Sequence, residues 1–233
     1  MTVLAGGYGL RRVRRAGVFT LFALVFVVIA GLAVALMAYL LAPRWPEPVE
    51  AVEAPPLPIV VAGVVFNVPP AAIRIAVQRR AGPQERIDLV YLWPSLTPPD
   101  PHGADPSPHL FITVETVQAS LPAAERLKSI YPRYIDEQPT SDGRGLTTAP
   151  FADGTPYRGE DLIYDATAPE RFLVRCTRPR TELTPATCLY ERAIGAAAVT
   201  FRFPREWLDD WRAVVDGIDQ LVEGWRPSAA ARR

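Results

Sequence analysis

The longest apolar run of the chain covers residues 16 to 42 and contains no charged residue. A bilayer core about 30 Å thick needs roughly 20 apolar helical residues, so the run predicts a transmembrane helix over Ala16–Ala42. A cleaved signal peptide is the main alternative, but its apolar region usually has about 7–15 residues and ends at a small-x-small site. This run is longer, and Pro43 follows it directly. The pattern therefore favours an uncleaved membrane anchor.

The charges that flank this run predict its direction. Four arginines precede it, at positions 11, 12, 14 and 15, whereas only Arg44 follows closely. Basic residues stay on the cytoplasmic side of a membrane. We therefore expect residues 1–15 to form a cytoplasmic tail and the chain after the anchor to lie outside the cytoplasm. Arginine supplies all but one of the 25 basic residues, a usage typical of a GC-rich bacterial genome. The expected location is thus the bacterial inner membrane, with the C-terminal part in the periplasm.

Residues 43–58 contain six prolines, which disfavour helix and sheet and favour an extended polyproline II chain. This segment predicts a stalk. It would connect the anchor to a folded domain, which we expect over residues 59–227. Residues 228–233 would then form a short tail.

Alternation of apolar and polar positions, which indicates strands, recurs along the domain. It is clearest at Ile87–Trp93. The predicted strands are Ile59–Phe66, Ile87–Trp93, Leu110–Val117, Leu162–Tyr164, Arg171–Arg178, Thr187–Ala193 and Ala197–Phe203. We predict loops over residues 94–108 and 136–157, because both are rich in proline, glycine and polar residues.

Helical spacing predicts three further elements. Residues 71–80 suggest a short amphipathic helix, although they also fit strand alternation, and Pro122 begins a second helix that should end near Tyr131. The clearest helix starts at Pro204 and ends before Pro227. Its apolar positions, including Trp207, Trp211, Val214, Ile218 and Trp225, fall on one stripe. An exposed stripe would be a docking face, but the preceding strands need a cover. The predicted fold class is therefore α+β, with a mainly antiparallel sheet packed by the amphipathic C-terminal helix.

The two cysteines of the chain, Cys176 and Cys188, lie in two of the predicted strands. In an oxidising periplasm such a pair usually forms a disulfide. The 11 residues between them contain turn formers, so we expect 172–178 and 187–193 to pair as antiparallel strands joined by a Cys176–Cys188 bridge.

Charge limits the classes of partner. From Ala16 onward the chain carries 21 basic and 25 acidic residues, a balance that argues against a nucleic-acid partner. The expected partners are the lipid bilayer and a protein of the cell envelope. Arg175 and Arg178, near the cysteines, are either phosphate-binding or surface residues. Glu160 and Asp161 should point to opposite faces of a strand and so make a poor acid/base pair.

One cluster resembles a metal site. The chain's two histidines alternate with carboxylates, as Asp100, His102, Asp105 and His109. These ligand types suit zinc or similar ions, but the segment is rich in proline and lacks the helical i,i+4 spacing of metalloproteases. A solvated loop is the simpler interpretation, and no cofactor is expected. The alternative function is an envelope enzyme that holds a metal at His102 and His109.

Several fragments carry a resemblance. The sequences FLVRC, TCLYERAIG and FRFPREWLDDWR, with YLWP upstream, are similar to those of single-pass inner-membrane proteins of proteobacteria, over Ile59 to Trp225. The resemblance implies location and fold but no activity. Without a catalytic motif, we expect a binding or scaffolding domain rather than an enzyme.

Overall fold

The computed structural model describes residues 9–41, 54–100, 103, 106–116, 121–179 and 185–226. The chain divides into two compact units, Met1–Trp45 and Pro46–Arg233. Most of the predicted stalk (residues 43–58) and all of the predicted tail (residues 228–233) lie outside the described residues.

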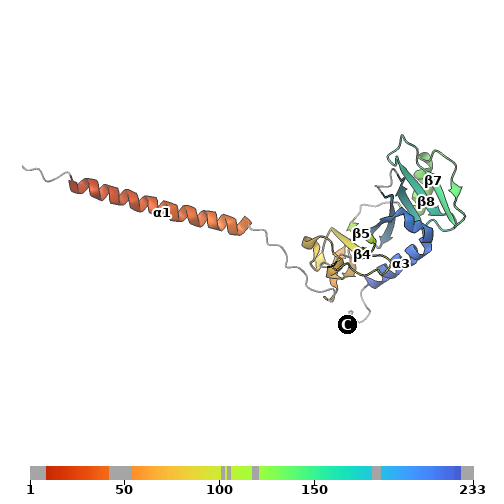
Figure 1. The fold of residues 1–233 in the computed structure, drawn as a ribbon, viewed down its shortest axis with the longest axis horizontal. Helices are drawn as coiled ribbons and strands as arrows, with labels where there is room; N and C mark the ends of the chain where they lie inside the picture. The colour runs from red at the N-terminus through yellow and green to blue at the C-terminus, as the bar shows by residue number, and fades with distance from the viewer. Residues whose placement is uncertain are drawn as a thin grey trace, which may run out of the picture. The chain divides into compact units, whose positions relative to one another are not determined.

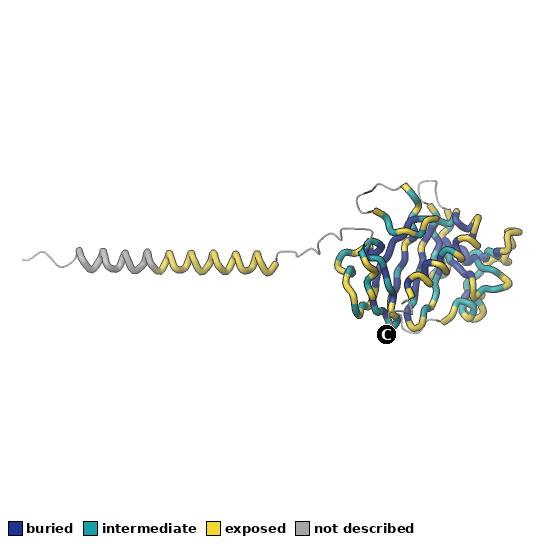
Figure 2. The backbone as a smooth tube through the Cα atoms, turned by 90° about the horizontal axis from the view of Figure 1, so that it is seen from below, coloured by how far each residue is buried: buried dark blue, intermediate teal, exposed yellow. Residues whose placement is uncertain are grey.

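The first unit contains a single described helix, α1 (Gly9–Leu41). It begins inside the segment that we predicted as a cytoplasmic tail. Its stretch Phe22–Leu41 is 20 residues long, with a mean hydropathy of 2.8, and is long and apolar enough to cross a membrane or to serve as a signal sequence. The side chains of this stretch are exposed (Figure 2).

The second unit is an α+β domain, as predicted (Figure 1). An eight-stranded sheet has the order β4-β5-β11-β10-β9-β8-β7-β6, and all neighbouring strands in it are antiparallel. The strands are β4 (Arg86–Leu92), β5 (His109–Thr116), β6 (Thr140–Ser141), β7 (Leu146–Pro150), β8 (Glu160–Asp165), β9 (Leu173–Thr177), β10 (Thr187–Ile194) and β11 (Ala197–Pro204). The buried backbone runs through the middle of the domain (Figure 2).

The predicted C-terminal helix covers one face of this sheet. It is a 3₁₀ segment, η4 (Arg205–Asp210), followed by α3 (Trp211–Gly224). Asp210 caps α3, because its side chain accepts a hydrogen bond from the N–H of Ala213. The apolar stripe is buried in one core with residues of β4, β5, β10 and β11. The stripe is therefore a core element and not an exposed docking face.

The apolar run 59–66 forms two strands where we predicted one. β1 (Leu57–Val61) and β2 (Val64–Val68) pair as a hairpin, and the two turn residues, Ala62 and Gly63, have φ of 50° and 77°. Such positive φ angles are typical of the two-residue turns that connect hairpins. A continuous apolar sequence conceals this turn. β1 also begins two residues before the predicted domain boundary.

The predicted helix over residues 71–80 is wrong. Two short 3₁₀ turns, η1 (Pro70–Ala72) and η2 (Ala76–Gln78), take its place. Between them Ile73 is fully buried and forms an antiparallel bridge with Leu89 of β4. The segment then enters β3 (Gly82–Pro83), which pairs in parallel with β1 and completes a three-stranded sheet. Strand alternation, the other pattern that these residues fit, agrees better with the Ile73 bridge.

The predicted loop over 136–157 contains β6 and β7.

A second, smaller core lies behind β7, β8 and β9, where helix α2 (Ala123–Ser129) and the 3₁₀ turn η3 (Tyr131–Arg133) cover the sheet. Tyr131 and Phe151 are the large buried residues of this core, with ring centroids 5.5 Å apart. The large sheet is thus covered by different elements on each side.

The cysteines lie where the strand prediction placed them. β9 and β10 pair antiparallel, and Cys176 lies directly opposite Cys188. Both residues are fully buried, with Cα atoms 4.0 Å apart and sulfurs 1.98 Å apart. The pair is compatible with a disulfide.

Trp225, at the end of α3, joins three elements of the fold. Its carbonyl accepts a hydrogen bond from the N–H of Asn67 in β2 (2.8 Å). Its indole N–H donates to the hydroxyl of Tyr91 in β4 (3.0 Å), and both side chains are 2% exposed. Burial raises the pKa of Tyr91 well above its usual value, although the bond from Trp225 opposes the rise. Tyr91 is therefore neutral, and its hydroxyl accepts the hydrogen bond of the buried indole N–H at the end of the helix.

We expect Tyr91→Phe to lower the free energy of unfolding by about 1–3 kcal/mol, because the buried indole N–H then has no acceptor. The double variant Tyr91→Phe/Trp225→Phe should show a non-additive cost, since the second change removes the unpaired donor. Urea unfolding of the full chain in detergent measures both. Tyr164→Phe, on the second core, is the control. Strict additivity of the two changes would contradict the proposed coupling.

Candidate functional site

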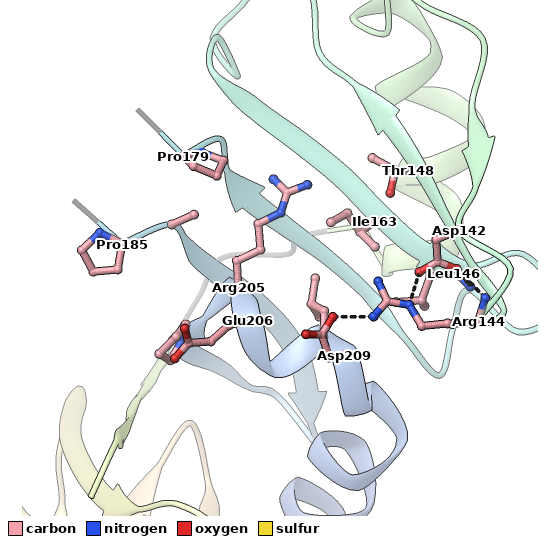
Figure 3. A pocket seen from close by; sticks show the side chains of 13 residues that line it. Asp142, Arg144, Leu146, Thr148, Ile163, Pro179, Pro185, Arg205, Glu206 and Asp209 are labelled. Carbon is pink, nitrogen blue, oxygen red and sulfur yellow. Dashed lines mark hydrogen bonds and ion pairs between the residues drawn. The ribbon is translucent and has the colours of Figure 1, made fainter. Parts of the chain in front are cut away.

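A groove of about 400 Å³ lies between the β6–β8 end of the large sheet and η4 (Figure 3). Its floor is apolar: Leu146 of β7, Ile163 of β8 and Leu208 of η4 are almost completely buried. Prolines 179, 185 and 204 border one side. We call it the η4 groove. Its rim consists of charged side chains, which the local turns hold in place.

Asp142 and Arg144 form one part of the rim. The SDGRG turn between β6 and β7 places a carboxylate oxygen of Asp142 2.8 Å from the N–H of Arg144 and 3.1 Å from that of Leu146. Gly143 and Gly145 have φ of 74° and 94°, which glycine adopts without strain. Desolvation raises the pKa of Asp142, but these hydrogen bonds and the Arg144 guanidinium outweigh it and hold the pKa below its usual value. Asp142 is therefore ionised at neutral pH.

Arg144 also links the two sides of the groove. Its guanidinium donates to Asp142 on its own turn (3.2 Å) and to Asp209 of η4. Its carbonyl accepts hydrogen bonds from the indole of Trp211 and from Arg212, both at 3.2 Å. Through these contacts the SDGRG turn is attached to the covering helix.

Arg205 forms the opposite wall and is fixed by a buried carboxylate. Asp161, with only 9% of its side chain exposed, lies 2.6 Å from an Arg205 nitrogen and 2.7 Å from the Nε of Arg178. Arg178 also donates to the carbonyls of Phe151 (2.9 Å) and Glu160 (3.2 Å). The two ion pairs fix the position of the Asp161 carboxylate between the two arginines. Arg205 is thus held at the groove while Glu206 and Asp209 follow it on η4 (Figure 3).

The neighbouring acid Glu160 points to the other side of β8, as predicted. It lies 3.0 Å from Arg175, which also contacts Glu191 (3.4 Å), and Glu191 pairs with Arg126 of α2 at 2.5 Å. Burial lowers the pKa of Arg175, but the charges of Glu160 and Glu191 outweigh it and raise the pKa above its usual value. This network fastens α2 to the sheet. Arg175 and Arg178 are therefore occupied by carboxylates of the chain itself.

The chemistry of the η4 groove suits a polypeptide. Side chains of both charges surround an apolar floor, and most of them have their geometry fixed by the fold. Charges of both signs select a complementary surface, and a fixed geometry reduces the ordering cost of binding. A single anion would meet Asp142 and Asp209 as well as the arginines. No local sequence pattern predicts this site, because its residues come from four separate stretches of the chain, 142–148, 163, 179–186 and 204–209. The Asp-Gly pair in SDGRG, a hairpin signal, was the one available clue.

The predicted metal ligands lie elsewhere. His102 and Asp105 fall outside the described residues. His109 begins β5 and its ring stacks on Phe111 with centroids 5.9 Å apart, while Asp100 lies in the loop before it. Within the described part of the chain, no group of three or more His, Cys, Asp or Glu side chains is placed to hold a metal ion. The metal site stays a prediction.

No protein-family model and no curated protein matches the chain. Among solved structures, the domain is similar to Smlt3025, an immunity protein of the Stenotrophomonas maltophilia type IV secretion system. The TM-score is 0.52 at 14% identity, over 75% of this chain and 94% of that one. The iron-regulated outer membrane lipoprotein FrpD of Neisseria meningitidis gives a TM-score of 0.43 at 13% identity, over 77% of this chain and 96% of that one. The first likeness shows a shared fold.

We predict that Asp142→Asn lowers the free energy of unfolding at neutral pH by about 0.2–1 kcal/mol, as expected for an exposed ion pair. The amide still accepts the turn's hydrogen bonds, so only the charge is lost. Because the folded pKa of Asp142 is lowered, its contribution is present above the unfolded pKa and disappears as the pH falls through the folded pKa. The wild type and the variant should therefore converge in acid.

Urea unfolding of the full chain in detergent at about pH 7 and about pH 3 measures this difference. Asp153→Asn, at an exposed turn, is the matched control. A difference between wild type and Asp142→Asn that persists unchanged in acid would show that the turn, and not the charge, is responsible.

Proposed function

We propose that this protein is a single-pass protein of the bacterial inner membrane whose periplasmic α+β domain binds a protein of the cell envelope. The observation that carries the proposal is the exposed apolar stretch Phe22–Leu41 in the same chain as a domain with its own core. Twenty consecutive residues of this hydropathy are unstable in water and require an apolar surrounding. The domain itself buries its apolar stripe and needs no such surrounding.

Two features support the proposed orientation. The arginines at positions 11, 12, 14 and 15 favour a cytoplasmic N-terminus. The buried Cys176–Cys188 pair favours an oxidising compartment for the domain, because disulfides persist there and are rare in the cytosol.

The η4 groove is the proposed binding site. Its apolar floor would accept a side chain of the partner, and its rim would pair with charges of both signs. The likeness to an immunity protein of a type IV secretion system adds support, because that neighbour shares the fold and belongs by its name to a secretion system. The partner is thus expected to be a protein with a mixed-charge segment and an apolar anchor residue.

A reporter that is active only in the periplasm, fused after Trp225, should be active, because the N-terminal arginines hold the other end in the cytoplasm. In the same cells, Cys176 and Cys188 should resist alkylation until a reductant is added. Activity of a cytoplasm-only reporter at this position would contradict the proposed topology. Thiols that react without reductant would show that the disulfide is absent.

A photoreactive amino acid at Glu206, on the rim of the η4 groove, should form adducts with an envelope protein in intact cells. The same substitution at Gln220, an exposed position on α3, is the matched control and should not. Arg144→Glu reverses a rim charge and should reduce the adduct about tenfold or more, the range for a lost charge pair at an interface. Equal adducts from both positions, or none from Glu206, would exclude the groove as the binding site.

A further inference from the structure

A second surface of the domain lies beside the point where the chain arrives from the apolar helix. β1 begins at Leu57, and β3 runs parallel to it with Gly82 opposite Ile59. Because parallel strands run in the same direction, the residues that precede Gly82 lie at the same end as those that precede Ile59. The segment Arg74–Arg80, which we call the Val77 loop, is therefore next to the entry of the tether. In Figure 1 the orange and yellow segments of this region lie beside β4, away from β7 and β8.

The Val77 loop exposes apolar side chains. Val77 is 70% exposed, the highest fraction among the large hydrophobic side chains in the described part of the domain, and Ile75 is 37% exposed. Val77 borders a shallow hollow of about 580 Å³ together with Arg80, Pro83, Glu85 and Arg86. The exposed side chain of Val77 and the basic side chain of Arg80 thus lie on one surface.

The charge of this loop differs from that of the domain. Between Pro70 and Gln84 there are three arginines and no acidic residue, although acids outnumber bases in the chain from Ala16 onward. Arg86 beside the hollow is already paired with Asp88 at 2.7 Å. Within the described residues, no carboxylate forms an ion pair with Arg74, Arg79 or Arg80.

Four contacts hold the loop in shape. The Nε of Arg79 donates to the carbonyl of Ile73 (3.0 Å), and the guanidinium of Arg74 lies 5.6 Å from the centroid of the Phe111 ring. Gln84 donates to the carbonyls of Gln78 (2.9 Å) and Arg80 (2.7 Å) from the other side. These contacts therefore hold the loop in the conformation that exposes Val77.

Basic residues around exposed apolar side chains are the chemistry of a surface that lies on anionic lipid. Fifteen residues lie between Leu41 and Leu57, so at about 3.1 Å per residue the chain can reach roughly 50 Å. We propose that the Val77 loop docks the domain onto anionic phospholipid headgroups of the membrane in which the protein is anchored. This inference rests on the proposed membrane anchor.

The experiment uses the full chain in vesicles that contain nitroxide-labelled lipid, with an environment-sensitive fluorophore on Val77→Cys. The two native cysteines face each other, so the added thiol is the labelling site. Ala166→Cys, exposed after β8, is the control position. It lies five strands from β4 in the sheet order, about 24 Å across the sheet. Vesicles with phosphatidylglycerol are compared with vesicles of phosphatidylcholine alone.

We expect quenching at position 77 in phosphatidylglycerol vesicles and at least about twofold less in phosphatidylcholine vesicles or at about 1 M salt, which screens charge beyond about 3 Å. Arg80→Glu should reduce the quenching in the same way, whereas Arg158→Glu, a matched reversal at an exposed turn, should not. Position 166 should stay unquenched throughout.

Flotation of the protein with the vesicles after alkaline extraction tests the anchor separately. Protein that floats without quenching at position 77 would overturn the lipid contact and leave the anchor in place. Equal quenching in both lipids would overturn the role of anionic headgroups. Protein that fails to float would contradict the proposed anchor, and the docking proposal would then fail as well.

Discussion

The packing of Trp225 is the interaction on which the arrangement of the domain depends. The small sheet, the large sheet and α3 are separate elements, and much of their contact is apolar packing in one core, which is non-directional. Trp225 adds direction: its carbonyl is bonded to Asn67 of β2 and its indole to Tyr91 of β4. Its ring also meets Phe66 edge-on, with centroids 6.2 Å apart. One residue at the helix end is thus bonded to a strand of each sheet.

The other end of the same helical segment organises the η4 groove in a comparable way. Trp211 packs on Phe172 with ring centroids 5.1 Å apart and donates its indole N–H to the carbonyl of Arg144. The apolar stripe and the charged rim are therefore different faces of one segment: tryptophans hold it to the sheet, and Arg205 and Asp209 line the groove. A change in the core packing of η4 would also displace the rim charges.

The sequence predicted the fold class because its strongest signals are local. Alternation over Ile87–Trp93 and the stripe from Trp207 to Trp225 each depend on spacing within one element, and both elements were found. One error was local, the two-residue turn at Ala62 and Gly63 that divides the run 59–66 into two strands. Others came from interactions between distant segments. Ile73 could face a helix or a strand by its pattern, and its bridge to Leu89, sixteen positions later, decided the outcome. Likewise the η4 groove needs Asp161 beside Arg205, which no local pattern records. The predicted ligands His102 and Asp105 lie outside the described residues, so the structure leaves that interpretation where it stood.

The two surfaces of the domain have a geometric relation that bears on how binding would work. The η4 groove includes residues of β7 and β8, whereas the Val77 loop leads into β3 and lies beside β4, at the opposite edge of the large sheet. Several strand widths of about 4.8 Å separate them. A domain held on lipid through the Val77 loop would therefore keep its groove open to a partner. Docking would also limit the orientations of a domain on a fifteen-residue tether, and this reduction of rotational freedom would lower the entropic cost of meeting a partner. In the proposed arrangement, tether, loop and groove would act together: the apolar helix would supply proximity and the loop would supply orientation.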